Sequence, residues 1–402
     1  MEINSNQTTV LKVENKRNYG IDFFRMLSML MVLILHIMGF GGILRSTVVL
    51  STNYEIAWLI YTLAYGAVNC YALISGFVGV DSTYKIHKII TLWVQVVFYT
   101  LSITLAFSVF IPEAVEGGMS WIKAALPVLF DQYWYFTAYF CMFFFIPVLN
   151  YLLNTLDKKK MEKLLLGIVF LFSIYPTIRG KDIFGTQSGY SMVWLIALYL
   201  VGGYIKKYRI ADEIKGKKAI FLFFACILVT WGSKIIIEYA CLKFTGTVMA
   251  WNFLVSYVSP TILLGSIALL FFFAKFPING KGARSLIRLF TPTAFGVYLI
   301  HLHPLFADNL LVNRFVLLAD KPTLQMVIYI ICVVGTIYVV CSLADMVRIK
   351  IFKLLRVEQF SMWIVKTAAQ SLNRCVNRYH KSKNEKRCIL QEDLSEQKQE
   401  VL

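Results

Sequence analysis

The sequence predicts an all-α protein that crosses a membrane about ten times, with both termini in the cytoplasm. The composition carries this prediction, because 58% of the 402 residues are hydrophobic, only 16% are charged and the mean hydropathy is +0.65. Average soluble proteins hold about 45–50% apolar and about 25% charged residues. The composition therefore excludes a water-soluble globular protein, and the 15% of aromatic residues suits side chains at lipid and headgroup depth.

The chain offers ten apolar segments for membrane crossing. A helix needs roughly 20 apolar residues to cross about 30 Å of hydrocarbon. Two of the segments, the fifth and the sixth, are short. The ten expected spans lie near residues 20–41, 56–80, 88–111, 134–155, 163–179, 190–205, 218–240, 250–274, 290–312 and 323–347.

The basic residues set the expected orientation. Most of the 40 Lys and Arg residues fall in alternate loops, and cytoplasmic loops carry such an excess. We expect a cytoplasmic tail over residues 1–17, a membrane domain over 18–347 and a basic cytoplasmic tail over 348–402. That last tail should begin as an interfacial helix and end disordered after about residue 376. The first span should remain as an uncleaved anchor in a multi-pass protein of the cell membrane.

A net charge of +17 is compatible with two kinds of binding partner, nucleic acid or an anionic bilayer. The basic residues stand in short clusters between apolar stretches, which favours the lipid bilayer and argues against nucleic acid. The sequence does not indicate an oligomeric state.

Three ionisable residues lie in the first span, in GIDFFRMLSMLMVLILH: Asp22, Arg25 and His36. Asp22 and Arg25 are three residues apart and share a helix face. From Arg25 to His36 a helix returns to within about 20° of the same direction and rises roughly 16 Å. One stripe therefore carries a cation at the inner mouth and an imidazole farther in, which suits a transmembrane group-transfer site. The alternative is that Arg25 reaches lipid headgroups and His36 is a hydrogen-bonded histidine inside the bundle.

A second group stands in FGVYLIHLHPLF of the ninth span. Tyr298 and His301 are three residues apart and share a face, whereas His303 points about 200° away from His301. Charged and polar residues at bilayer depth are candidates for function. A metal site on these histidines is the less favoured alternative, because no carboxylate or cysteine stands at ligand spacing.

Weaker features complete the set. Lys234 and Glu238, at i and i+4, predict a mutually neutralising pair. Ser75 and Gly76 favour a close helix approach. Trp134 belongs to an aromatic run that indicates an interfacial belt or, as the sharper alternative, a surface for stacking sugars.

These residues give the chain a resemblance to acyltransferase family 3, whose members move acetyl or other acyl groups onto sugars and other envelope acceptors. The first span resembles the family's helix with an Arg and a His, here Arg25 and His36. Three further segments are similar to family motifs: YALISGFVGV, YWYFTAYFCMFFFIPVL and FGVYLIHLHP. The resemblance covers about residues 18–347. It implies a ten-span bundle that takes acyl-CoA, as a co-substrate and not a bound cofactor, from the cytoplasm.

The resemblance also implies roles. His36 would be the catalytic base or the acyl relay, Arg25 would contact the donor and His301 would help line the site with Asp22, Ser75, Trp134 and Tyr298. Where the family usually has an Arg pair, this chain has Lys85 and Lys88, which attract phosphate without a bidentate fork.

The function expected is O-acyl transfer, most simply from acetyl-CoA, to a cell-surface polysaccharide or a lipid-linked sugar. The alternative is an exporter of such a polysaccharide or lipid-linked sugar.

Overall fold

The computed structural model describes residues 17–247 and 253–399. These residues form helices joined by turns and loops, and they contain no strand. The expected N-terminal tail thus lies, apart from Arg17, outside the described residues, as does the start of the eighth expected span at 250–252. The longer helices are α1 (Tyr19–Gly39), α3 (Thr52–Ala64), α4 (Ala67–Gly79), α5 (His87–Phe110), α7 (Trp134–Phe143), α8 (Ile146–Thr155), α9 (Lys158–Val169), α11 (Met192–Lys207), α13 (Gly216–Thr245), α14 (Pro260–Lys275), α15 (Lys281–Phe290), α18 (Thr323–Leu354) and α19 (Val357–Gln399).

Short helices connect these elements. The α-helical ones are α2 (Ile43–Ser46), α6 (Gly117–Ala125), α10 (Tyr175–Arg179), α12 (Ile210–Glu213), α16 (Ala294–His301) and α17 (Pro304–Phe306). The 3-10 and π segments are η1 (Pro112–Ala114), η2 (Phe170–Ile174), η3 (Gln187–Gly189), η4 (Thr291–Thr293), η5 (Ala307–Leu311) and η6 (Val316–Leu318).

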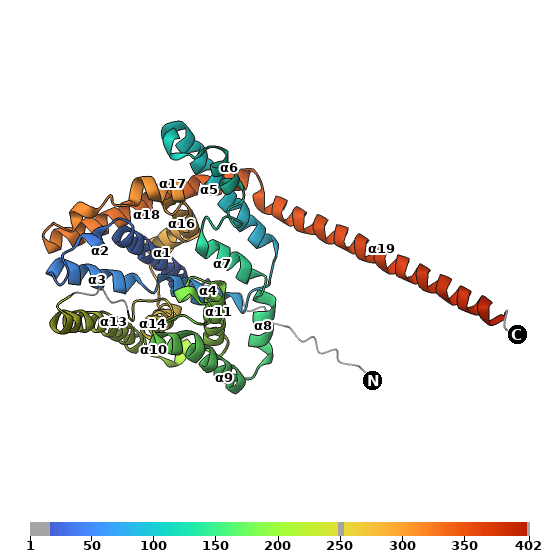
Figure 1. Cartoon of the computed structure of the whole chain (residues 1–402), viewed down its shortest axis with the longest axis horizontal. Helices are drawn as coiled ribbons and strands as arrows, with labels where there is room; N and C mark the ends of the chain where they lie inside the picture. Colours follow the sequence, from blue (N-terminus) through green and yellow to red (C-terminus); the bar gives the residue numbers. More distant parts are fainter. Residues whose placement is uncertain (1–16, 248–252, 400–402) are drawn as a thin grey trace, which may run out of the picture.

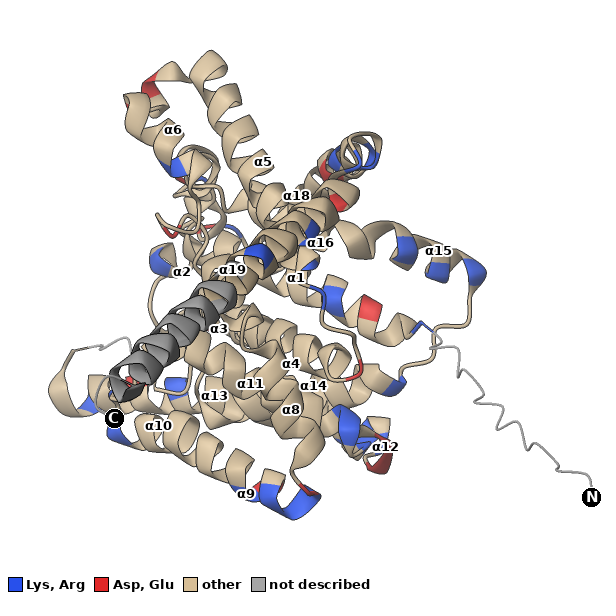
Figure 2. Ribbon diagram, turned by 90° about the vertical axis from the view of Figure 1, so that its right-hand side faces the viewer, with Lys and Arg blue, Asp and Glu red and all other residues tan. Residues whose placement is uncertain are grey.

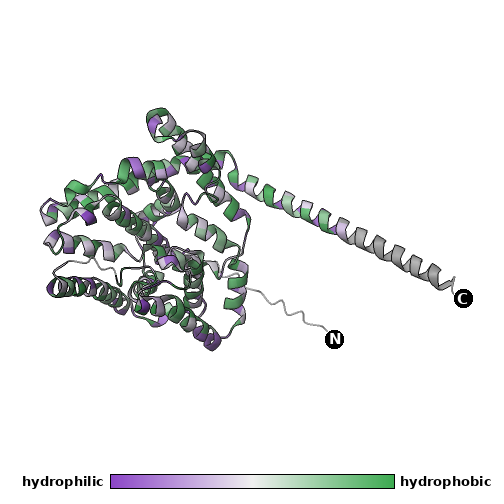
Figure 3. Cartoon of the chain, viewed as in Figure 1, coloured by the Kyte–Doolittle hydropathy of each residue, from purple (hydrophilic) through white to green (hydrophobic). Residues whose placement is uncertain are grey.

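The helices form one bundle around α1 and α4. Helix α4 packs against α11, α1 and α14, and α1 also contacts α3, α16 and α18 (Figure 1). Figure 3 shows hydrophobic residues along most of each helix of the bundle. Figure 2 shows basic residues gathered at α9 and α15 and in the segments that flank α12, as expected for helix ends outside the hydrocarbon.

Glycines bring α4 and α11 into close contact. A Cβ added at Gly76 would lie 2.0 Å from the Tyr199 carbonyl oxygen, and one at Gly202 would lie 2.1 Å from the Leu73 carbonyl oxygen. Small residues let membrane helices approach this closely. The close helix approach expected at Ser75 and Gly76 is therefore confirmed at Gly76.

Each of the ten expected segments coincides with one or more helices. Fewer than ten of them are single helices that are long and apolar enough to cross a membrane. In the described residues six helices are long and apolar enough to cross a membrane, or eight if each of two bent pairs is one span. The pairs are α7 with α8, bent by 58°, and α15–α16 with α17–η5, bent by 66°. Helices α11 and α14 have only 16 residues each. The sequence pattern did not show this, because it does not reveal where a helix begins.

The C-terminal helix α19 leaves the bundle as one long element (Figure 1). Its first turns pack on α5 through the buried Val357 and Ser361. The disordered end expected after about residue 376 is not what the structure has, since α19 continues to Gln399. The residues of this end are rich in Lys, Glu, Gln and Arg, which are good helix formers. That α19 begins as an interfacial helix stays a prediction.

Candidate functional site: a histidine pair beside a cationic cavity

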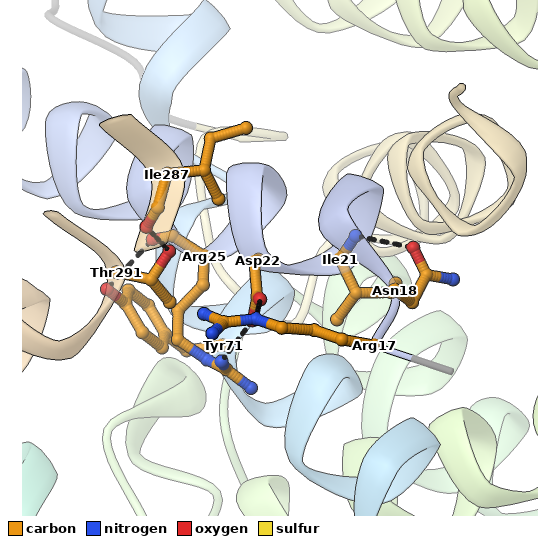
Figure 4. Close-up of polar contacts among 8 residues, drawn as sticks. All are labelled: Arg17, Asn18, Ile21, Asp22, Arg25, Tyr71, Ile287 and Thr291. Atoms are coloured by element: carbon orange, nitrogen blue, oxygen red, sulfur yellow. Dashed lines mark hydrogen bonds and ion pairs between the residues drawn. The ribbon is translucent and has the colours of Figure 1, made fainter. Parts of the chain in front are cut away.

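The start of α1 holds Arg25 in place. Asn18 caps the helix by accepting the Ile21 amide N–H at 3.1 Å. Asp22 then accepts from Arg17 Nε at 2.5 Å and from Arg25 Nη1 at 3.2 Å, and Figure 4 marks these contacts with dashed lines. The shared helix face expected for Asp22 and Arg25 is confirmed. One carboxylate between two arginines leaves a net positive charge here.

Arg25 faces a cavity of about 330 Å³ that collects the predicted donor residues. Lys85 from the α4–α5 loop, Lys88 from α5 and Ser75 from α4 line the same cavity. No Asp or Glu is among its lining residues. We call it the cationic cavity. Asp22 does not line it and instead positions Arg25, which corrects the expected place of Asp22 as a lining residue.

His36 lies about three helical turns beyond Arg25. It pairs with a second histidine. Its Nδ1 is 3.0 Å from Nε2 of His301, whose Nδ1 is in turn 2.6 Å from the Val297 carbonyl oxygen. His301 is completely buried, and the His36 ring stacks on Phe40 with centroids 5.2 Å apart.

The hydrogen bonds assign the tautomers of the histidine pair. A carbonyl oxygen only accepts, so Nδ1 of His301 carries a proton and donates to Val297. In neutral His301, Nε2 then accepts, and the donor is the Nδ1–H of His36. Nε2 of neutral His36 is left with a free lone pair. This is the arrangement in which one group orients a general base.

The break after α16 puts His301 at the end of its helix. Pro304 has no N–H and cannot continue α16, and His303 caps α17 by accepting the Leu305 amide N–H at 3.2 Å through Nδ1. Because the helix ends at His301, the face angle expected for His303 from a continuous helix does not apply. Within residues 17–247 and 253–399, no three His, Cys, Asp or Glu side chains gather closely enough to hold a metal ion.

His36 lines a second cavity of about 270 Å³, which we call the histidine cavity. Trp134 and Tyr298 line it as well, so three of the predicted site residues meet here. The Tyr298 hydroxyl is buried against the backbone of Tyr135 and Phe136 and makes no hydrogen bond with another side chain among residues 17–247 and 253–399. Trp134 packs on Tyr190 with ring centroids 4.6 Å apart. Both residues also border a further cavity of about 260 Å³ that contains Asp131 and Asp308.

The two main cavities share a wall. Tyr71 of α4, Tyr135 of α7 and Phe295 of α16 line both the cationic cavity and the histidine cavity. The Tyr71 hydroxyl donates to the Arg25 carbonyl oxygen at 3.0 Å (Figure 4). Arg25 and His36, on one stripe of α1, therefore stand in adjoining cavities.

Of these three aromatic residues, Tyr135 stood in the aromatic run with Trp134, whereas Tyr71 and Phe295 were not singled out in the sequence. Each lies close to a residue that was singled out, since Tyr71 is four residues before Ser75, Tyr135 follows Trp134 and Phe295 is three residues before Tyr298. Positions three or four apart share a helix face. That spacing could have indicated these residues. It could not show that α4, α7 and α16 meet at one wall.

The fold and the site define a multi-pass membrane protein in which a paired histidine adjoins a cavity suited to an anionic group. The family model of an acyltransferase domain matches residues 18–345, and the chain belongs to this family, acyltransferase family 3, as its motifs indicated. No curated protein and no solved structure matches the chain. The family supports membrane acyltransferase activity in general.

Proposed function

We propose that this chain is an O-acyltransferase of the cell membrane, most simply an O-acetyltransferase. It would take the acyl group from cytoplasmic acyl-CoA and pass it to a hydroxyl of a cell-surface polysaccharide or lipid-linked sugar. The observation that carries the proposal is the bond between His36 and His301, which leaves His36 Nε2 free in a cavity adjoining the cationic cavity.

The cationic cavity suits the donor. Acyl-CoA carries phosphate groups, and Arg25, Lys85 and Lys88 supply three cations with no carboxylate among the lining residues. Lysines act as point charges, so Arg25 is the only one of the three that offers a planar fork. The donor's thioester would point toward the wall shared by Tyr71, Tyr135 and Phe295.

The histidine pair suits general base catalysis. In the proposed step, His36 Nε2 removes the proton of an acceptor hydroxyl as that oxygen attacks the thioester carbonyl carbon. The tetrahedral intermediate collapses, the carbon–sulfur bond breaks, and the CoA thiolate takes the proton from His36. His301 holds the His36 ring through the 3.0 Å bond and is a positioning residue. The alternative is that His36 Nε2 itself attacks, carries the acyl group and then yields it to the acceptor.

Tyr298 supplies a further role in this step. Its side chain lines the histidine cavity, and its buried hydroxyl makes no hydrogen bond with another side chain within the described residues. A preorganised donor of this kind stabilises the negative charge that develops on the carbonyl oxygen in the transition state. We assign Tyr298 to that oxyanion.

The lining of the histidine cavity supports a sugar acceptor. Tyr61, Trp134, Tyr190 and Tyr257 all line it, and the rings of Trp134, Tyr190 and Tyr257 form consecutive contacts with centroids 4.6 and 5.0 Å apart. Aromatic rings with polar edges offer both an apolar face and hydrogen bonds to such an acceptor.

The test is transfer of radioactive acetyl from acetyl-CoA in membranes that contain the wild-type chain or His36→Ala, with envelope polysaccharide precursors as acceptor. The proposal expects label in the sugar fraction with the wild type and none with His36→Ala at equal protein in the membrane. Label that persists at the wild-type level in His36→Ala would remove His36 from the mechanism.

The exporter alternative has one observation in its favour, the two bent helix pairs, since broken helices are common in transporters. Both breaks adjoin helices that line the cavities, α7 and α16. The same assay separates the two functions, because an exporter would transfer no acetyl label to the precursor. It would instead move the precursor across the membrane of sealed vesicles.

A further inference from the structure

A polar pocket at the end of α10 adjoins the histidine cavity. Its volume is about 260 Å³, close to the roughly 270 Å³ of the histidine cavity. Ser188 lines this pocket, which we call the α10 pocket, and Tyr190 of the same loop lines the histidine cavity. In a second loop Ser256 and Tyr257 divide in the same way. The Ser256 hydroxyl donates to the Ser188 carbonyl oxygen at 3.3 Å, so the two loops together form one wall between the two spaces.

One carboxylate holds the first of these loops. Asp182 accepts from three backbone N–H groups, each at 3.2 Å, those of Phe184, Thr186 and Ser188. With this support Gln187 and Ser188 adopt φ angles of +50° and +54°, which are uncommon for residues other than glycine. Backbone held in such a conformation by its surroundings is found most often at functional sites.

Buried polar side chains of the bundle hold the second loop. Asn69 Nδ2 donates to the Tyr257 carbonyl oxygen at 2.8 Å. Ser173 Oγ donates to the Val258 carbonyl oxygen at 2.5 Å. Asn69 and Ser173 are both completely buried. Both loops of the α10 pocket are therefore fixed before a ligand arrives, and a preorganised site has less ordering to lose on binding.

The lining of the α10 pocket can both donate and accept hydrogen bonds. Lys181 supplies an exposed ammonium group, Asp182 a half-buried carboxylate and Ser188 an exposed hydroxyl. Phe253, which is 41% exposed, adds an aromatic face. Sugar hydroxyls donate and accept at once, whereas a phosphate would be repelled by the Asp182 carboxylate. The lining therefore suits a sugar better than an anionic headgroup.

From this arrangement we propose that the α10 pocket binds a second sugar unit of the acceptor, beside the unit that receives the acyl group in the histidine cavity. The inference rests on the proposed function and narrows the acceptor to a chain of at least two sugar units. Lys181 donates to one hydroxyl of the second unit. Asp182 Oδ2, which accepts only the Ser188 N–H, accepts from another. The nearly equal volumes of the two cavities match successive units of similar size.

Acetyl transfer to acceptors of graded length tests the proposal on the full chain. Partial acid hydrolysis of envelope polysaccharide precursors, followed by size fractionation, gives fractions of one, two, and three or more sugar units. We expect kcat/KM of the wild type to rise roughly tenfold from the one-unit to the two-unit fraction through a lower KM, as two added hydrogen bonds give. Longer fractions should add little. The same kcat/KM for one and two units would overturn the proposal.

Two variants with matched controls assign this gain to the α10 pocket. Thr177→Trp fills the pocket and should remove the gain, whereas Ile178→Trp, on the same helix at a 74% exposed position outside the lining, should keep it. Lys181→Met removes one charged donor and should reduce the gain about fivefold. Lys243→Met, at an exposed position outside all three spaces, should not. The full gain in folded Thr177→Trp would contradict the assignment.

Hydrogen–deuterium exchange separates a failure of this inference from a failure of the proposed function. Without acetyl-CoA, the two-unit fraction should slow exchange in residues 181–190 of the wild type more than the one-unit fraction does. This protection in a protein that transfers no acetyl would contradict the proposed function and retain the second sugar site. Transfer without the protection would contradict the second site alone. Should Thr177→Trp fail to elute as a single species in detergent, the gain in Lys181→Met decides.

Discussion

Two buried polar groups of this protein differ in how their atoms are used. Between α3 and α13, Lys234 Nζ lies 2.5 Å from Glu238 Oε1 and 2.7 Å from the Tyr54 hydroxyl, and it faces the rings of Tyr54 and Trp58. Between α1 and α16, the His36–His301 pair leaves one imidazole nitrogen uncommitted beside a cavity.

The difference separates structure from chemistry. Lys234 and Glu238 are 2% and 0% exposed, neutralise one another and line neither the cationic nor the histidine cavity. The sequence-based prediction of a mutually neutralising pair is confirmed. His36 instead presents an unused nitrogen to a space that a substrate can enter, and the Tyr298 side chain lines the same space. A buried charge with its partners stabilises a fold, whereas an uncommitted base next to a cavity can react.

The largest expected effect falls on activity at the histidine pair. His36→Ala removes the general base and should lower kcat by about 10²–10⁴-fold. Because it also removes the hydrogen bond to buried His301, the thermal unfolding midpoint in detergent should fall, but less than in Lys234→Met. Steady-state acetyl transfer by purified protein measures kcat. Near wild-type kcat would place the base elsewhere.

A comparable effect, but on stability, is expected at Lys234. Lys234→Met leaves Glu238 without its counterion and also removes the cation that interacts with Glu55. Breaking a buried pair costs about 3–5 kcal/mol. Thermal unfolding should show the loss, and combining Lys234→Met with Glu238→Leu should restore most of it. A single variant as stable as wild type would contradict the role given to this pair.

Tyr298→Phe should reduce kcat by about 10²-fold, the loss typical of one oxyanion donor. The Tyr298 hydroxyl makes no hydrogen bond with another side chain in the described residues, so its removal should change the unfolding midpoint little. Single-turnover transfer of labelled acetyl is the measurement. An unchanged rate would show that the hydroxyl does not contact the reacting carbonyl.

Changing Lys85 and Lys88 together to Gln should raise KM for acyl-CoA roughly 10-fold or more, since each surface cation contributes about 1 kcal/mol to phosphate attraction. Arg25→Lys, which loses the planar fork, should likewise raise this KM more than it lowers kcat. The matched control is the Lys217 and Lys218 pair changed to Gln, which lies outside both cavities. Equal KM in variant and control would argue against phosphate binding in the cationic cavity.

The smallest effect is expected at Tyr54. Tyr54→Phe removes one hydroxyl from the bonds to Lys234 and Glu238 and should cost about 1 kcal/mol of stability. Transfer per folded molecule should not change. The substitution is the same as at Tyr298, so loss of activity from Tyr54→Phe would erase the distinction between the two groups.

Local periodicity explains what could be predicted. The pairs of Asp22 with Arg25 and of Lys234 with Glu238 follow from helix spacing alone, as does the stripe that carries Arg25 and His36. Family motifs indicated His301 as a residue of the site. Its 3.0 Å contact with His36 joins residues 265 positions apart, and no local pattern gives such a distance.

Other features depend on where helices stop. The ninth expected span, 290–312, is in the structure the end of α15 followed by η4, α16, α17 and η5, with a bend beside Pro304. Apolar content does not distinguish this broken path from a straight span. The residues of α15 were counted by their basic side chains as a loop before the ninth span, so the helix itself was not expected.

The most direct test measures acetyl transfer and thermal unfolding on the same preparations of His36→Ala and Lys234→Met. The account predicts that His36→Ala loses transfer with only a small drop of the unfolding midpoint, while Lys234→Met transfers normally per folded molecule at a much lower midpoint. Transfer retained in His36→Ala, or lost in folded Lys234→Met, would contradict it.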